Sequence, residues 1–402
     1  MIRKISYPLL SNAFSNNDIN CGIKVLKSGQ VTMSNITKKF EKKFAKKIGA
    51  KYALMTNSGS SANLLAISAL VNPLFEKQLK PGDEVLIPAI CWSTSLWPIV
   101  QNNLKPVFVD VELDTFNISL NSLKNKISSK TRAIMCVHVL GTSANLNNII
   151  KLIKNKNILL IEDTCESLGT KFNNKYLGTF GEFGTFSFYY SHQITSGEGG
   201  MIVCNKVNNY NILKSLRSHG WSRGTKLHNY YKKKFNKIDD RFIFINSGYN
   251  VRPTDIQAAI AHNQFNKLYK FINARNQNRK IIINKIKTNP KWNNQFYFVE
   301  HSKNVTPSWF GLAILINKKL LKKKKTFLNY LTKKGIENRP ILSGNFINQP
   351  SAKLYNLNKK KFTFQNAQKV EDQGFFIGLH TKKISNRIAE YVSQNLLKIS
   401  EL

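Results

Sequence analysis

Short apolar runs alternate with amphipathic stretches along the first half of the chain. Buried strands are predicted for the apolar runs at 51–57, 85–88, 106–111, 132–139 and 158–161. Strands that alternate with helices need crossover connections, and such connections make a sheet largely parallel. The pattern therefore predicts an α/β fold built on a mostly parallel sheet flanked by helices.

The second half continues with two more predicted strands and several helices. Strands are predicted at 185–190 and 201–204, and helical patterns cover 210–217, 256–265, 269–286 and 318–334. The basic segment 222–237 is predicted to be a loop that reaches over a site or a neighbouring subunit. Because 402 residues exceed what one core usually organises, we expect a large domain over 1–255 and a smaller α/β domain over 256–402.

Bulk properties favour a cytoplasmic protein with no membrane partner. No apolar run approaches the roughly 18 residues that span a bilayer, and residues 1–21 do not resemble a cleavable leader. The five cysteines are scattered without a Cys-x-x-Cys spacing, which favours reduced thiols and no metal site.

The net charge of +39 is typical of proteins that bind nucleic acid. However, the lysines are spread along the whole chain, and the densest run, at 318–325, falls in an amphipathic segment whose lysines can cover a solvated helix face. We therefore expect no nucleic-acid partner, although a non-catalytic basic binding or regulatory protein stays open as an alternative.

A serine-rich turn marks a candidate anion site. Ser58, Gly59 and Ser60 follow the predicted strand 51–57 directly and open a helix. The first backbone N–H groups of a helix and the helix dipole attract an anion such as a phosphate. A serine can also cap a helix without any ligand.

Further candidate residues follow other strand ends, where open α/β sheets place their sites. Glu162, Asp163 and Glu166 follow strand 158–161, and Trp92 lies just beyond strand 85–88. A carboxylate cluster on the surface and a core tryptophan are the plain alternatives. Glu162 is expected to be structural.

The segment 181–200, GEFGTFSFYYSHQITSGEGG, combines an apolar run with Ser187, His192 and a Gly-Glu-Gly-Gly turn. It resembles the active-site block of the DegT family. The members of this family are fold type I enzymes that use pyridoxal 5'-phosphate (PLP) to modify nucleotide-linked sugars. His192 stands where most of that family has the lysine that binds the cofactor covalently. An imidazole can shuttle protons near neutral pH but cannot form that link.

The resemblance covers nearly the whole chain and is closest to a His-for-Lys subgroup of 3-dehydratases. It implies PLP and its amine form, pyridoxamine 5'-phosphate, as cofactors. The cofactor-binding residues that it implies are Ser58, Gly59, Ser60, Trp92, Asp163, Glu166, Ser187 and Asn250. The catalytic residues would be His192, Asp163 and His219, and the substrate would meet Arg252 and Arg339. In the family, the residue at Asn250 reaches the partner subunit's cofactor, so a homodimer with shared sites is expected.

The implied reaction removes the C3 hydroxyl of a nucleoside-diphosphate 4-keto-6-deoxyhexose, with glutamate as amino donor. A related dehydrase that carries an iron–sulfur cluster is disfavoured, because a cluster needs about four thiolates and no cysteine follows Cys204. An aminotransferase homologue that tolerates His192 and an inactive homologue with a degraded lysine site remain as alternatives. His219 is also compatible with an ordinary helix-end or surface position.

Overall fold

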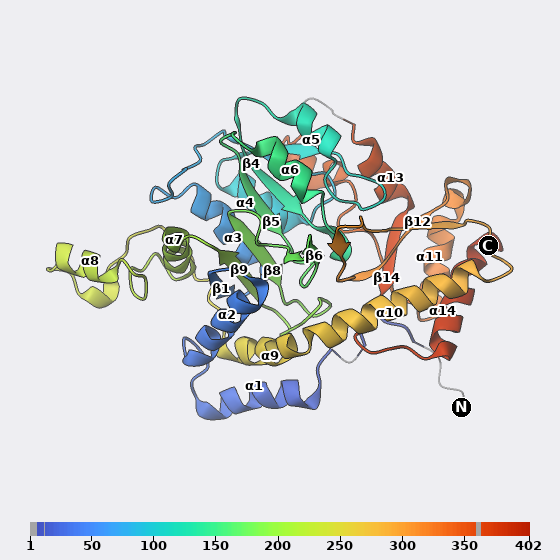
Figure 1. Cartoon of the computed structure of the whole chain (residues 1–402), viewed down its shortest axis with the longest axis horizontal. Coiled ribbons are helices and arrows are strands. Elements are labelled where there is room, and N and C mark those ends of the chain that lie inside the picture. Colours follow the sequence, from blue (N-terminus) through green and yellow to red (C-terminus); the bar gives the residue numbers. More distant parts are fainter. Residues whose placement is uncertain (1–5, 12, 359–362) are drawn as a thin grey trace.

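A seven-stranded sheet lies at the centre of the computed structural model, which describes residues 6–11, 13–358 and 363–402 (Figure 1). Its strands are β1 (Tyr52–Thr56), β2 (Glu84–Pro88), β3 (Lys105–Val109), β4 (Thr131–Val137), β5 (Leu159–Asp163), β8 (Phe183–Ser187) and β9 (Gly200–Cys204). They follow the order β1-β9-β8-β5-β4-β2-β3. Only β9 runs antiparallel to its neighbours β1 and β8, while the other pairs are parallel. The predicted fold class is confirmed.

Helices cover both faces of this sheet because alternate side chains of each strand point to opposite sides. On β1, Leu54 enters one apolar core, and its neighbours Ala53 and Met55 enter another. The first face carries α3 (Gly59–Leu70), α4 (Ser93–Gln101) and α7 (Val207–Arg217). The other face carries α2 (Asn35–Ile48), α5 (Leu120–Lys126), α6 (Leu146–Ile153) and α9 (Asp255–Asn266). Strands buried on both faces explain the nearly continuous apolar runs in the sequence.

A second, antiparallel sheet lies in the C-terminal part. It consists of β10 (Phe296–Phe298), β12 (Gly311–Ile316), β14 (Gly374–Gly378) and β13 (Asn338–Arg339), in that spatial order. Its surrounding helices are α10 (Leu268–Lys287), α11 (Lys324–Lys333), α13 (Gln365–Gln373) and α14 (Asn386–Leu397). The Tyr7 hydroxyl donates to the Gly378 carbonyl at 2.9 Å, so residues near the N-terminus contact this sheet. The division into domains after residue 255 stays a prediction.

The remaining elements are short or peripheral. A small sheet joins β6 (Lys171–Phe172), β7 (Lys175–Tyr176) and β11 (Val305–Thr306), and the other helices are α1 (Asn16–Ser28), α8 (His228–Lys234) and α12 (Pro350–Leu354). The prediction of a loop over 222–237 is wrong at His228–Lys234, which form α8. This helix projects from the body of the molecule (Figure 1). None of the residues of this lysine-rich helix is buried. The sequence therefore lacks the periodic apolar positions from which a helix is predicted. Across residues 6–11, 13–358 and 363–402, no helix has the length and apolar character needed to cross a membrane.

Candidate active site

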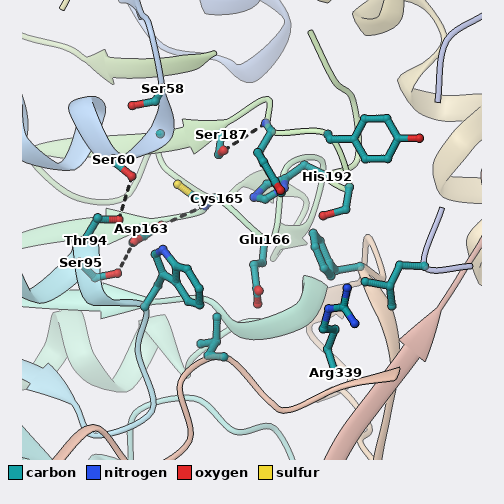
Figure 2. Close-up of a pocket in the computed structure, with 18 of the residues that line it drawn as sticks. Ser58, Ser60, Thr94, Ser95, Asp163, Cys165, Glu166, Ser187, His192 and Arg339 are labelled. Atoms are coloured by element: carbon teal, nitrogen blue, oxygen red, sulfur yellow. Dashed lines mark hydrogen bonds between the residues drawn. The ribbon is translucent and has the colours of Figure 1, made fainter. Parts of the chain in front are cut away.

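A cavity of about 860 Å³ opens where β5 and β8 end, beside the N-termini of α3 and α4 (Figure 2). Residues 8–10, together with strands and loops of the second sheet, complete its wall. Most of the candidate residues predicted from the sequence line it together: Ser58, Gly59, Ser60, Trp92, Asp163, Glu166, Ser187, His192 and Arg339. Strand ends that are far apart in sequence therefore meet at one site.

The start of α3 forms a cradle for an anion. Ser58 caps the helix, and its hydroxyl accepts a hydrogen bond from the Ser61 N–H at 3.1 Å. A Cβ added to Gly59 would lie 2.5 Å from the Ser187 Cβ, so only glycine fits between the helix and the end of β8. The open N–H groups of the first turn and the hydroxyls of Ser60 and Ser187 suit a phosphate group.

Asp163 is held by a chain of polar side chains. Its Oδ2 accepts hydrogen bonds from Asn63 Nδ2 at 2.8 Å and Ser95 Oγ at 2.7 Å, and its Oδ1 accepts one from the Cys165 N–H at 3.1 Å. Thr185 orients the Asn63 amide by donating to its Oδ1 at 2.6 Å. The carboxylate is therefore fixed in one orientation, and its Oδ1 keeps acceptor capacity toward the cavity. Sequence analysis missed the roles of Asn63, Ser95 and Thr185, although all three fall in or beside motifs that it singled out.

Glu162 has a structural role, as expected. Its buried carboxylate accepts hydrogen bonds from the backbone N–H groups of Gly178, Phe180 and Gly181 at 2.6–2.9 Å. It also contacts His138 Nε2 at 3.3 Å. Because His138 Nδ1 accepts from the Ala144 N–H, the ring proton lies on Nε2 and points at Glu162. The carboxylate thus organises the turn that leads into β8.

Replacing Glu162 by alanine is expected to lower the free energy of unfolding by about 3 kcal/mol or more. The reason is that three buried N–H groups would lose their acceptor, at about 1–3 kcal/mol each. Urea unfolding measures this loss. Among the described residues, the exposed Glu76 has only a long contact to Lys206, so Glu76→Ala should cost less than about 1 kcal/mol. Equal losses for the two variants would contradict the role given to Glu162.

Glu166 is poised to titrate near neutral pH. Burial, followed by the negative charge of Asp163, raises its pKa to about 7, although a hydrogen bond from the Leu140 N–H at 2.9 Å opposes the shift. Leu140 adopts a left-handed backbone conformation with φ of 50°, which is unusual for a leucine and aims its N–H at this carboxylate. Glu166 can therefore hold or release a proton within the cavity.

Trp92 is not a core residue. Its side chain is 52% exposed at the start of α4 and lines the cavity. An exposed indole beside a cradle for phosphate offers a flat face to an aromatic ring.

His192 extends from the loop after β8 into the cavity wall, and Figure 2 shows it between Ser187 and Glu166. The rings of Tyr189 and Phe310 pack edge-on against it, with centroids at 5.8 and 5.1 Å. Its Nδ1 is buried and finds no hydrogen-bond partner among the residues that the structure describes. Burial and the nearby charge of Arg275 lower the pKa of His192 to about 3. The imidazole is therefore neutral at physiological pH, and one of its ring nitrogens keeps a free lone pair.

The lowered pKa of His192 predicts a pH-dependent loss of stability. An unfolded histidine titrates near 6.5, so between pH 6.5 and about 3 the unfolded chain binds a proton that the folded chain does not. Stability from this group is complete above pH 6.5 and falls as the pH falls. Between pH 7 and 5, the wild type should lose about 2 kcal/mol more unfolding free energy than His192→Asn. Denaturant titrations at both pH values test this, and equal losses would show that the imidazole titrates normally in the fold.

Three predicted site residues do not line this cavity. His219 and Asn250 are exposed, and the backbone bridge between Ser218 and Asn250 holds them near each other. Arg252 lies over the Trp221 ring at 5.5 Å, and its buried Nη1 has no hydrogen-bond partner in the described part of the chain. Only Asn250 is expected to reach the cofactor of a partner subunit, and the roles of all three residues stay predictions.

The cysteines are all free thiols: Cys21, Cys91, Cys136, Cys165 and Cys204. Within the part of the chain that the structure describes, no three His, Cys, Asp or Glu side chains cluster closely enough to hold a metal ion.

The fold and the cradle for an anion at its strand ends together indicate the class to which the protein belongs, which the comparison with known families identifies. Residues 13–396 match the DegT/DnrJ/EryC1/StrS aminotransferase family, and the chain belongs to this family. GDP-4-keto-6-deoxy-D-mannose 3-dehydratase of Escherichia coli O55:H7 is 38% identical over 388 residues, which cover 96% of this chain and 98% of that protein.

Solved structures lead to the same relatives. A GDP-4-keto-6-deoxymannose-3-dehydratase variant with bound GDP-perosamine is 36% identical, with a TM-score of 0.89 over 97% of this chain and 100% of that chain. The same kind of enzyme with a trapped PLP-glutamate geminal diamine has a TM-score of 0.86 at 36% identity, over the same shares of the two chains.

Proposed function

We propose that this chain is a PLP-dependent 3-dehydratase that removes the C3 hydroxyl of a nucleoside-diphosphate 4-keto-6-deoxyhexose. The observation that carries the proposal is the cavity wall, where His192 presents an unpartnered imidazole and where, among the described residues, no lysine occurs. The product would be a 3,6-dideoxy-4-keto sugar. Two relatives that are named as GDP-4-keto-6-deoxy-D-mannose 3-dehydratases match this chain over 98% of their own length and support this choice.

The residues of the cavity fit the cofactor. The start of α3 with Ser58, Gly59 and Ser60, together with Ser187, would hold its phosphate. Trp92 offers a flat face to its ring, and the fixed Asp163 carboxylate can accept a hydrogen bond from a protonated pyridine nitrogen. When bound, the amine form of the cofactor supplies the electrons that replace the C3 hydroxyl with hydrogen, and its ring takes up negative charge.

His192 would act as the base and then as the acid. Its neutral ring would take up a proton in the cavity beside the cofactor and would return it to the departing hydroxyl, which would leave as water. Glu166, with its pKa of about 7, can hold a second proton at the same cavity. Arg339 lines the cavity, where it is paired with Glu337, and we propose that it meets the substrate. Glutamate is proposed as the donor that restores the amine, in line with the glutamate adduct of the solved relative.

We also propose a homodimer with shared sites, in which Asn250, Arg252 and His219 complete the cavity of a second copy. The exposed Asn250 and the unpartnered guanidinium nitrogen of Arg252 support this arrangement, because both would gain partners at an interface.

The test of this function is the product of the full chain with PLP, ¹⁵N-labelled glutamate and GDP-4-keto-6-deoxy-D-mannose. A dehydratase would yield a sugar nucleotide that has lost one oxygen atom and carries no ¹⁵N, together with 2-oxoglutarate and ¹⁵N-labelled ammonium, which hydrolysis releases. A product that contains ¹⁵N would instead identify an aminotransferase. Binding of duplex DNA without cofactor uptake would favour a basic binding protein.

A further inference from the structure

Arg275 is a completely buried arginine behind the cavity wall. It lies on α10 and is 1% exposed. Its Nη1 donates to the carbonyl of Phe310 at 3.0 Å and, more weakly, to that of Trp309 at 3.4 Å. Its Nη2 donates to the backbone carbonyl of His192 at 3.0 Å. One guanidinium thus joins the loop of His192 to the residues that lead into β12.

No carboxylate of the described residues forms an ion pair with Arg275, and its Nε is buried without a partner. Burial lowers its pKa to about 10, so the group stays protonated at neutral pH. A buried, uncompensated charge costs free energy, and an apolar residue could fill the same space at lower cost. A role beyond packing would explain why a charged group is present.

We propose that Arg275 is a positioning residue for His192. It fixes the backbone of His192 against Phe310, whose ring packs edge-on against the imidazole at 5.1 Å. The imidazole is thereby confined between its own tethered backbone and that ring. The proposal rests on the proposed role of His192 as the proton carrier.

The charge of Arg275 also favours the neutral imidazole, because two cations repel each other. Other ionisable groups surround the ring. In the cavity these are the carboxyl groups of Asp163, Glu166, Glu198 and Glu337 and the guanidinium of Arg339. Cys165, His138, Tyr189 and Tyr190 line the same cavity, and Tyr7 and His380 lie on the side of Arg275. Without the positive charge of Arg275, the negative charge of the cavity carboxylates would be offset less, so the pKa of His192 should rise.

Arg279 provides a matched control on the same helix. It stacks on the Trp309 ring at 4.2 Å, donates to the Val299 carbonyl and pairs with Glu300 at 3.2 Å. It is thus a second largely buried arginine that holds the chain just before β12. None of its contacts in the described residues reaches His192.

The test compares the wild-type chain with Arg275→Gln, Arg275→Lys and Arg279→Gln. Full-length protein with ¹³C-labelled histidine rings, without added cofactor, gives the titration midpoint of His192 by NMR, and His192→Asn assigns the signal. Arg275→Gln should raise the midpoint by about one pH unit. In the enzyme loaded with PLP it should lower kcat about 10²-fold, with KM within about threefold. Arg279→Gln should change neither quantity.

The proposal would be overturned if Arg275→Gln had the same His192 titration midpoint and the same kcat as Arg279→Gln. If Arg275→Gln does not fold, Arg275→Lys decides the question. Lysine keeps the charge but cannot bond both carbonyls in the same way, so kcat should fall about tenfold with an unchanged midpoint, and a wild-type kcat would overturn the proposal. If the wild type itself shows no dehydratase turnover, the proposed function fails, while the NMR midpoints still decide whether Arg275 acts on His192.

Discussion

Replacement of His192 by asparagine is expected to lower the turnover number about 10²–10⁴-fold, which is the usual contribution of a positioned acid or base. Asparagine fills similar space but cannot accept a proton. The groups proposed to hold the cofactor, including Ser58 and Asp163, belong to other elements, so cofactor uptake should stay near the wild-type level. Steady-state kinetics gives the turnover number, and the absorbance of the bound cofactor reports uptake.

His301 offers the control for this prediction. It is exposed, and its ring bonds only to the carbonyl of Ser302 among the described residues. His301→Asn should keep turnover within about twofold. A His192→Asn variant with more than about a tenth of wild-type turnover would show that another group carries the proton.

Replacement of Asp163 by asparagine is expected to lower turnover about 10²–10³-fold, the loss typical of removing one preorganised electrostatic contact. The three donors around this carboxylate, from Asn63, Ser95 and the Cys165 N–H, leave no good place for an amide NH₂ group. An asparagine also lacks the negative charge that would stabilise a protonated pyridine nitrogen. Kinetics at saturating cofactor measures the effect.

Ser95→Ala is the graded control for Asp163. It removes one hydrogen bond to Oδ2 and leaves the carboxylate and the Asn63 contact in place. Turnover should therefore fall by about tenfold or less. Equal losses in the two variants would mean that hydrogen-bonded geometry, and not the negative charge of Asp163, determines the rate.

The strands could be predicted because burial on both faces leaves a simple signal. The run predicted at 158–161 becomes β5, which ends at Asp163, and the run at 85–88 becomes β2. Residues at the ends of such strands meet at one edge of the sheet. Asp163 and His192 follow predicted strands, which indicates a shared site, whereas the place of Ser187 in that site is predicted from the family resemblance; all three line the cavity.

The supporting contacts could not be predicted in the same way. Asn63 and Ser95 bond Asp163 across sequence separations of 100 and 68 residues, and both are ordinary polar residues of helices. Arg275 lies on an amphipathic helix that also carries many exposed cations, so nothing local distinguishes it. Partners of this kind depend on how elements pack, which periodicity does not encode.

The candidates at His219, Asn250 and Arg252 illustrate a different limit. Structural contacts are enough to explain the conformation of these segments. Thr254 caps α9, and the backbone bridge between Ser218 and Asn250 joins the two loops. In the proposed homodimer their chemistry would depend on a second chain, which neither local pattern nor the fold of one chain determines.

The most direct test of the central claim, a cofactor enzyme without a covalent lysine, is a borohydride-trapping experiment with PLP and glutamate. Wild-type protein should convert the cofactor from its aldehyde to its amine form without a reduced adduct on the protein, whereas His192→Lys should give such an adduct after borohydride treatment. Absorbance and the mass of the intact protein report the two results. A trapped adduct on the wild type would contradict the account, because it would show that a lysine of this chain holds the cofactor.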